Sequence, residues 1–378
     1  MKERRTGARE AVLDAIRAAE PLSRVELAAM TGLTEASIST TVRKLLGEGL
    51  VVETGRTPTG GKPRTLLRLD PAARIAVGVH LDEDVTTYVL TGQTGGVISR
   101  MTRPAAPAGA GAADLVRRLA ADVGSLVDGS GVDRVRCLGI GLVGADPRLA
   151  RDHDLTEATG WPVLLENAAT AAAVGEYWVA RVEAARPFAA LYLGSGLGAG
   201  IVAGGEPLRG SHTRAGEFGH LCLQVDGPAC WCGSRGCLEA LAGPQVVVEA
   251  ARADPVAAGE AGLGAARSTV ADFAAVARAA RAGAPACRAL LDDSARYVAA
   301  AAESLVNLVD VDLLVLTGPG FAAASFVYAP AITARLGPAD ARTWHRSVSV
   351  TVSLAAATAS ATGAAALVLQ EALRSGQQ

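Results

Sequence analysis

Three cysteines lie within eight residues of one another, and a histidine precedes the first of them by ten positions. The chain reads Gly216-Glu217-Phe218-Gly219-His220, then Cys230-Trp231-Cys232-Gly233-Ser234-Arg235-Gly236-Cys237-Leu238-Glu239. One imidazole nitrogen and three thiolates form a donor set suited to tetrahedral zinc, and the two glycines let the loop turn tightly. We therefore expect a closed, structural zinc site held by His220, Cys230, Cys232 and Cys237. The alternative is a group of buried free thiols.

The remaining cysteines do not extend this cluster into a disulfide framework. Cys137, Cys222 and Cys287 are scattered along the chain, which is typical of a reducing compartment. No window approaches the roughly 18 apolar residues of a membrane span, and the charged start Met1–Arg5 is unlike a signal peptide. We expect a cytoplasmic protein.

The 378 residues predict two or three domains, and the charge is unevenly divided between them. Residues 1–68 hold 12 Lys+Arg against 8 Asp+Glu, a balance of +4, whereas the remainder has a balance of −6. All three lysines lie in that first stretch. A small basic module on an acidic body is typical of a nucleic-acid-binding head joined to another domain.

The first 70 residues predict three helices followed by a hairpin. Ser23, with Glu26 three positions later, forms a capping box at the start of the second helix. A turn containing Gly32 separates this helix from a third one, which Thr34 caps. The expected helices cover 8–19, 23–30 and 35–46, and the expected strands cover 50–54 and 64–69.

This order of elements predicts a winged helix-turn-helix that places its third helix in the major groove of DNA. Short polar and cationic side chains on that helix suit base edges and phosphates, and cations in the hairpin loop suit the backbone. A three-helix protein–protein module with solvated charges is the alternative. The candidate DNA-binding residues are Glu35, Ser37, Ser39, Thr40, Arg43, Lys44, Arg56, Lys62 and Arg64.

Asp70-Pro71 marks a domain boundary, because proline disfavours a helical predecessor. We expect a head at 1–70 and a body at 75–375. Beyond the boundary, strands and helices alternate in two α/β halves, each opening with antiparallel strands. Expected strands cover 75–81, 86–91, 97–102, 135–143, 162–166, 188–193, 198–203, 312–316 and 348–354. Expected helices cover 113–127, 155–160, 169–181, 271–282, 287–308 and the end of the chain from 358, with a turn at Asp152-His153-Asp154.

The cysteine motif, the Glu166-Asn167 pair and the Gly194-Ser195-Gly196-Leu197-Gly198 loop together resemble the ROK family of repressors, open reading frames and sugar kinases. With the winged helix in front, the likeness covers nearly the whole chain and points to the repressor branch. The resemblance implies an α/β, two-lobed actin-like (sugar-kinase, ASKHA) fold after about residue 72, with a sugar site between the lobes. The family's sugar contacts map onto Asn167, Glu217, His220 and Glu239. The second nitrogen of His220 would then donate to a ligand or to Glu239.

Two features of the resembling kinases are missing. Family kinases carry a catalytic Asp directly after the Glu-Asn pair, and Ala168, which cannot accept a proton, stands there. Their first phosphate loop, Asp-x-Gly-Gly-Thr, is replaced by His80-Leu81-Asp82-Glu83-Asp84, whose three carboxylates would repel a triphosphate. We therefore expect no kinase activity.

These observations predict a transcriptional regulator, most simply a repressor of carbohydrate-related genes, that binds double-stranded operator DNA as a homodimer or homotetramer and responds to a sugar or sugar phosphate. The segment between Gly144 and Trp161 is shorter than in most family members, which predicts either a wider sugar pocket or none. Its polar residues could instead form a buried network beside the zinc. Two alternatives remain: a ROK sugar kinase with a fused DNA-binding domain, and a regulator controlled by a protein partner, with a vestigial cleft.

Overall fold

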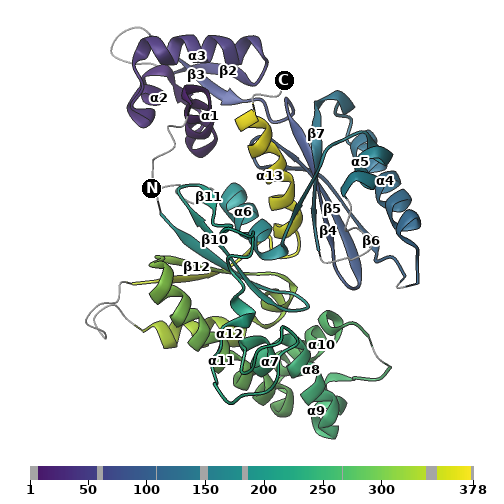
Figure 1. Cartoon of the computed structure of the whole chain (residues 1–378). Coiled ribbons are helices and arrows are strands. Elements are labelled where there is room, and N and C mark those ends of the chain that lie inside the picture. Colours follow the sequence, from purple (N-terminus) through teal and green to yellow (C-terminus); the bar gives the residue numbers. More distant parts are fainter. Residues whose placement is uncertain are drawn as a thin grey trace.

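The computed structural model describes residues 7–57, 63–107, 109–144, 152–180, 186–265, 267–337 and 347–375. These residues form a small helical head above a body made of two α/β lobes (Figure 1). Each lobe is built on a five-stranded sheet, and the head contains a three-stranded sheet. Among the described helices, none combines the length and apolar composition needed to cross a membrane.

The head has the winged helix-turn-helix arrangement. Ser23 and Glu26 form the expected capping box, and Gly32 ends the second helix in the left-handed conformation, with φ of 68°. Thr34 caps the third helix through the backbone N–H of Ser37. Apolar side chains from all three helices and the hairpin share one core. The elements are α1 (Ala8–Ala19), β1 (Leu22–Ser23), α2 (Arg24–Thr31), α3 (Glu35–Gly47), β2 (Val51–Thr57) and β3 (Arg64–Leu69).

The first lobe has the strand order β6-β5-β4-β7-β8. Its first three strands pair antiparallel, and β7 and β8 then add in parallel. Helices α4 and α5 lie together on one side of this sheet (Figure 1). The elements are β4 (Ile75–Leu81), β5 (Val85–Gly92), β6 (Val97–Pro104), α4 (Ala112–Gly129), β7 (Cys137–Val143), α5 (Asp152–Thr159) and β8 (Val163–Glu166).

The second lobe repeats the pattern with the order β11-β10-β9-β12-β13. An antiparallel hairpin comes first, and β12 and β13 are again parallel. Most of its helices pack around a core of their own. The strands are β9 (Phe188–Leu193), β10 (Leu197–Ala203), β11 (Glu206–Pro207), β12 (Leu313–Thr317) and β13 (Ser349–Val352). The helices are α7 (Leu238–Ala242), α8 (Pro244–Ala253), α9 (Pro255–Ala261), α10 (Thr269–Arg281), α11 (Pro285–Val309) and α12 (Pro319–Leu336).

Some sequence expectations were wrong. The strand expected from Val135 begins only at Cys137, because Asp133 caps a 3-10 turn over Arg134–Arg136 that leaves Val135 86% exposed. Asp152–Asp154 opens α5 instead of forming a turn. Helices α8, α9 and α12 were not expected, although each has proline at its first position, a common helix start.

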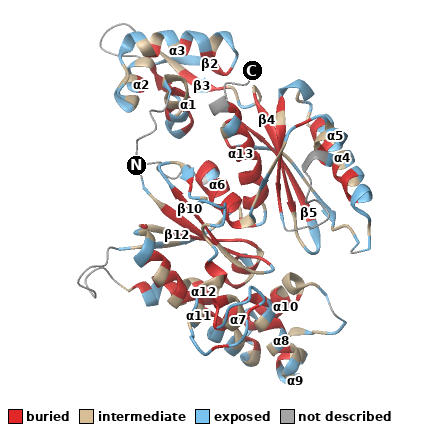
Figure 2. Cartoon of the chain, in the orientation of Figure 1, coloured by how far each residue is buried: buried red, intermediate tan, exposed pale blue. Residues whose placement is uncertain are grey.

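Two alanine-rich helices, α6 (Ala168–Ala180) and α13 (Ala359–Ser375), pack closely against each other between the two sheets (Figure 2). Glycines permit this approach. A Cβ at Gly363 would lie 1.6 Å from the carbonyl oxygen of Ala171, and one at Gly175 would lie 2.2 Å from that of Ala359. The sheet side is equally close, since a Cβ at Gly78 of β4 would lie 1.7 Å from the carbonyl oxygen of Ala361. Backbone thus packs on backbone through the middle of the body.

The head is attached to the body by a buried arginine. Arg17 of α1 is only 9% exposed, and its guanidinium lies 4.6 Å from the ring centre of Trp178 and 5.0 Å from that of Tyr177. It also donates to the Tyr177 hydroxyl at 3.3 Å. Both aromatic residues lie near the end of α6. Cation–π contacts of this kind strengthen when the cation is desolvated, so the head is held on α6 by more than the connecting chain.

Adding one methyl group at Gly363 tests how closely α6 and α13 pack. Gly363→Ala should lower the free energy of unfolding by about 2–3 kcal/mol, because the added Cβ overlaps backbone that cannot move without separating the lobes. Gly259→Ala in α9, where nothing lies within 4 Å of the added Cβ, is the matched control and should be neutral or slightly stabilising. Urea unfolding followed by circular dichroism measures both, and equal midpoints would contradict the close crossing.

Candidate functional site

The four predicted metal ligands converge in the second lobe. Their ligand atoms all lie within 4.8 Å of one another. The Sγ atoms of Cys232 and Cys237 are 3.8 Å apart, and His220 Nδ1 is 3.6 Å from Cys230 Sγ. Cys230 and Cys237 are buried and Cys232 is exposed. One nitrogen and three sulfurs at these spacings can hold a metal ion.

Local backbone geometry brings these ligands together. His220 closes a 3-10 turn over Phe218–His220, and Cys237 is the N-cap residue of α7. Gly236 has φ of 65°, and a Cβ there would lie 1.6 Å from the carbonyl oxygen of Gln224. A hydrogen bond from the backbone of Ser234 lowers the pKa of the Cys232 thiol, which favours the thiolate that binds metals.

A cleft of about 1170 Å³ lies between the two lobes. Asn167 and Ala168 line it from the start of α6, and Glu217 lines it from the segment leading into the metal loop. The side-chain oxygen Oδ1 of Asn167 caps α6 by accepting from the N–H of Thr170 at 2.6 Å. Among the described residues, the side-chain nitrogen Nδ2 has no hydrogen-bond partner, so it can donate to a ligand.

His220 and Glu239 lie behind this cleft wall. His220 Nε2 is 4.0 Å from Glu217 Oε2, so its ring joins the metal cluster to a cleft residue. The Glu239 carboxylate accepts from the backbone N–H of Leu197 at 2.8 Å, inside the Gly194–Gly198 loop. Burial raises the pKa of Glu239 to about 6, against the opposing effect of that hydrogen bond. The structure therefore brings Asn167 and Glu217 to the cleft, with His220 and Glu239 supporting the loops around it.

The predicted DNA-binding residues lie along α3 and the hairpin. Glu35, Thr40, Arg43 and Lys44 are exposed on α3, and Ser37 and Ser39 are half-buried. Arg56 and Arg64 are exposed on the paired strands β2 and β3, whereas Lys62 lies outside the described residues. Among the described ion pairs, none involves Arg43 or Lys44. Within the described part of the chain, α3 thus presents two exposed cations that form no ion pair.

Residues His80–Asp84, which we expected in place of a kinase phosphate loop, lie at the end of β4 and in the β4–β5 turn. His80 is buried, and this burial lowers the pKa of its imidazole. The negative charge of Asp82 acts in the opposite direction and raises that pKa. Its Nε2 is 3.5 Å from the hydroxyl of Tyr192 in the second lobe. Asp82 lines the cleft beside it.

Three cleft residues were not expected from the sequence. Arg209 forms an ion pair with Glu166 at 2.9 Å, and Tyr192 and Gln370 line the same space from β9 and α13. No local motif marks these positions. Their proximity follows from the meeting of segments that are far apart in the chain.

Comparison with known proteins agrees with this architecture. Residues 149–371, more than half of the chain, match the model of the ROK family. A xylose repressor from Bacillus subtilis is 26% identical in an alignment of 258 residues that covers 61% of this chain and 64% of the repressor. The chain thus aligns with less than two thirds of that relative.

Two solved structures extend the comparison. A ROK family transcriptional regulator, described as a homologue of the Escherichia coli MLC protein, superposes over 97% of this chain and 96% of its own, with a TM-score of 0.75 and 22% identity. A ROK hexokinase from Thermus thermophilus is 30% identical, with a TM-score of 0.62, and covers 78% of this chain and 98% of its own.

The body has the two-lobed actin-like fold of the sugar kinases, with winged helices in front of it, as the sequence predicted. The family match spans most of that body and includes the histidine and cysteine ligands. The chain belongs to the ROK family.

Proposed function

We propose that the protein is a DNA-binding transcriptional regulator, most simply a repressor, in which a ROK body controls a winged-helix head. Residues 1–70 form the DNA-binding domain, and residues 75–375 form the effector and oligomerisation domain. The observation that carries this proposal is the head itself, with its capped recognition helix, Gly32 turn and cationic hairpin. Phosphorylation of a sugar does not require a winged-helix domain.

The recognition helix α3 enters the major groove of operator DNA. Ser37, Ser39 and Thr40, with Glu35, are short enough to meet base edges, while Arg43 and Lys44 bind phosphates. The DNA sugar–phosphate backbone beside the groove is contacted by the cations of the hairpin, Arg56, Lys62 and Arg64. Two heads on half-sites about one helical turn apart require a homodimer or homotetramer.

A sugar or sugar phosphate in the interlobe cleft is the proposed effector. The 1170 Å³ cleft holds the amide of Asn167 and the carboxylate of Glu217, which suit sugar hydroxyls, and Arg209 suits an anionic group. His220 and Glu239 support these contacts from behind. Because the relatives include a xylose repressor, carbohydrate genes are the proposed targets.

Helix α6 connects the cleft with the head. Asn167 caps its first turn, and near its other end Tyr177 and Trp178 hold Arg17 of α1. A ligand that binds Asn167 differently in two lobe arrangements would shift the docking of the head, and with it the affinity for operator.

The metal in the second lobe is proposed to be structural zinc. Tetrahedral zinc with Zn–S near 2.3 Å and Zn–N near 2.0 Å would place its donors about 3.5–3.8 Å apart. The Cys232–Cys237 and His220–Cys230 separations of 3.8 and 3.6 Å match these values. With four protein ligands, the ion completes the fold of the loop and leaves no position for a substrate.

Removal of one ligand should abolish metal binding and destabilise the fold together. Cys232→Ser should lose the bound zinc and lower the melting temperature, because three remaining donors hold the ion weakly. Cys222→Ser, which alters an exposed thiol outside the cluster, is the matched control and should retain both. Elemental analysis and differential scanning calorimetry measure the outcome. A Cys232→Ser protein with normal zinc and stability would contradict the assignment.

DNA binding should depend on the α3 cations in a salt-dependent way. Arg43→Ala with Lys44→Ala should weaken binding to all sequences and flatten the slope of log K against log salt by about 2, one unit per lost phosphate contact. Arg117→Ala on α4, an exposed arginine of the body, should change neither.

Footprinting of the full chain on the DNA upstream of its own gene, with and without a panel of sugars, tests the proposal as a whole. We expect a protected site that one sugar weakens or strengthens. Wild-type protein that binds no duplex at low salt would overturn it. If DNA is bound but no sugar raises the melting temperature or alters the footprint, the effector is a protein partner instead.

Kinase activity is the second candidate, because the ROK hexokinase is also a relative. Ala168 is the first residue of α6 and lines the cleft. Its methyl group cannot accept a proton from a sugar hydroxyl. Loss of a general base costs about 10²–10⁴-fold in rate. We expect no ADP release above background in a coupled assay with ATP and a sugar panel. Turnover at ordinary enzyme rates would make the protein a kinase with a fused DNA head.

A further inference from the structure

The acidic turn between β4 and β5 is held rigidly by its own sheet. The Asp82 carboxylate accepts from the N–H of Glu83 at 2.8 Å, and the Asp82 N–H donates to the carbonyl of Val85 at 3.0 Å. The carbonyl of Asp84 accepts from the N–H of Ala105 at 2.8 Å. The next two carboxylates, of Glu83 and Asp84, are exposed and project beyond this turn.

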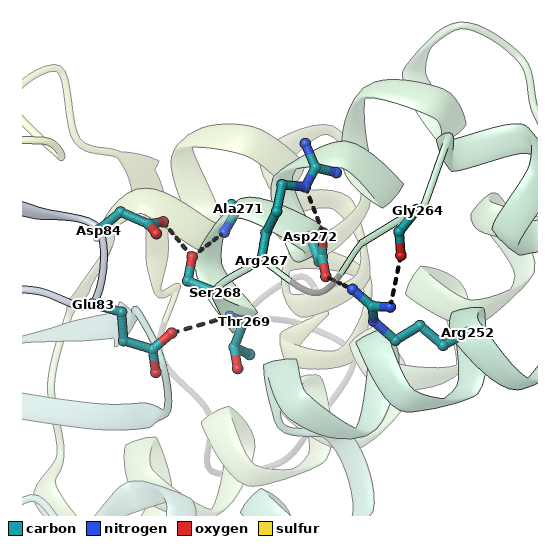
Figure 3. A network of polar contacts seen from close by, with 9 residues as sticks. All are labelled: Glu83, Asp84, Arg252, Gly264, Arg267, Ser268, Thr269, Ala271 and Asp272. Atoms are coloured by element: carbon teal, nitrogen blue, oxygen red, sulfur yellow. Dashed lines mark hydrogen bonds and ion pairs between the residues drawn. The ribbon is translucent and has the colours of Figure 1, made fainter. Parts of the chain in front are cut away.

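These two carboxylates bind the start of α10 in the other lobe (Figure 3). Glu83 accepts from the backbone N–H of Thr269 at 3.0 Å, and the Ser268 hydroxyl donates to Asp84. Ser268 is the N-cap of α10 and accepts from the N–H of Ala271 at 3.0 Å. The first lobe therefore completes the capping of a helix in the second.

Charge around α10 favours this contact. The start of a helix carries partial positive charge and unpaired N–H groups, so it attracts carboxylates. The acidic residue in the first turn of α10, Asp272, is already neutralised by ion pairs with Arg252 and Arg267 (Figure 3). It therefore does not repel Glu83 and Asp84.

The contact lies at the edge of a cavity of about 540 Å³ between the lobes. Asp84 lines this cavity from the first lobe, and Val270 and Pro319 line it from the second. Asp82 lines both this cavity and the larger cleft that contains Asn167. The separation of the lobes at the acidic turn thus affects both spaces.

We propose that Glu83 and Asp84 form an interlobe clasp. At the position where related kinases carry their first phosphate loop, this chain places two carboxylates that join the lobes directly through α10. The clasp keeps the lobes together without a nucleotide, and its release sets how far the body can open. This holds whether or not a sugar proves to be the effector.

Two variants break the clasp from opposite sides. Glu83→Ala with Asp84→Ala removes both acceptors; both residues are exposed, so folding should be unaffected. Thr269→Pro removes only the N–H that donates to Glu83. Proline is favoured at a first helical position, and Ser268 before it already has the extended conformation that proline requires, with φ of −62° and ψ of 157°.

Amide hydrogen exchange and small-angle X-ray scattering of the full chain measure the result. In the double alanine variant, exchange across residues 268–272 should accelerate about tenfold, as expected for the loss of hydrogen bonds to charged groups. Both variants should increase the radius of gyration, Thr269→Pro by less because it leaves the Ser268–Asp84 hydrogen bond in place. Adding Thr269→Pro to the double alanine variant should increase it no further, because the acceptor for that N–H is already gone.

The matched control is Asp114→Ala, whose ion pair with Arg117 stays within the first lobe. It should leave both measurements unchanged. Unaltered exchange at 268–272 in the double alanine variant would show that the contact does not form in solution. Faster exchange with an unchanged radius of gyration would show that the contact does not hold the lobes together. Either result overturns the clasp.

Discussion

Backbone-to-backbone packing at the centre of the body is the constraint on which the other parts depend. Gly78, Gly175 and Gly363 each lie where a Cβ would meet a carbonyl oxygen at 2.2 Å or less. These contacts pack α13 against β4 and α6 against α13. The two lobes are therefore held together at the base of the cleft. Interiors packed to this density transmit displacement instead of absorbing it. This gives α6 the stiffness that its proposed role between cleft and head requires.

Under the proposed function, two segments beside the cleft serve different chemistry from that of a kinase. Ala168 begins α6 directly after the Glu166-Asn167 pair, and the acidic turn Asp82–Asp84 follows β4. Carboxylates repel a triphosphate because both are negatively charged. They are attracted to the N-terminus of a helix because it carries partial positive charge. The same acidic residues would therefore disfavour nucleotide binding and form the proposed lobe-to-lobe contact.

Much of the fold could be predicted from the sequence because its signals are local. Helix α1 was predicted with its observed bounds, and the capping box at Ser23 and Glu26 located α2. Strands β3 and β4 were also predicted residue for residue. The convergence of His220 with the three cysteines was predicted for the same reason, since the ligands lie within eighteen residues of one another. Prediction failed at Val135, where apolar residues continue past the true start of a strand, and at α12, where Gly318-Pro319-Gly320 resembles a loop.

What the sequence by itself determined was the set of chemical groups: a capped third helix in a helix-turn-helix, one histidine and three cysteines in a turning loop, and an alanine directly after the Glu166-Asn167 pair. Each of these depends on neighbours a few residues away, so spacing and residue type suffice. Only the tertiary structure decided which distant groups meet. Arg17 lies against Trp178, Arg209 pairs with Glu166, and Glu83 reaches Thr269 across 186 positions of chain. Such pairs form because whole sheets and helices pack against one another. Local sequence patterns do not predict which distant residues this packing brings into contact.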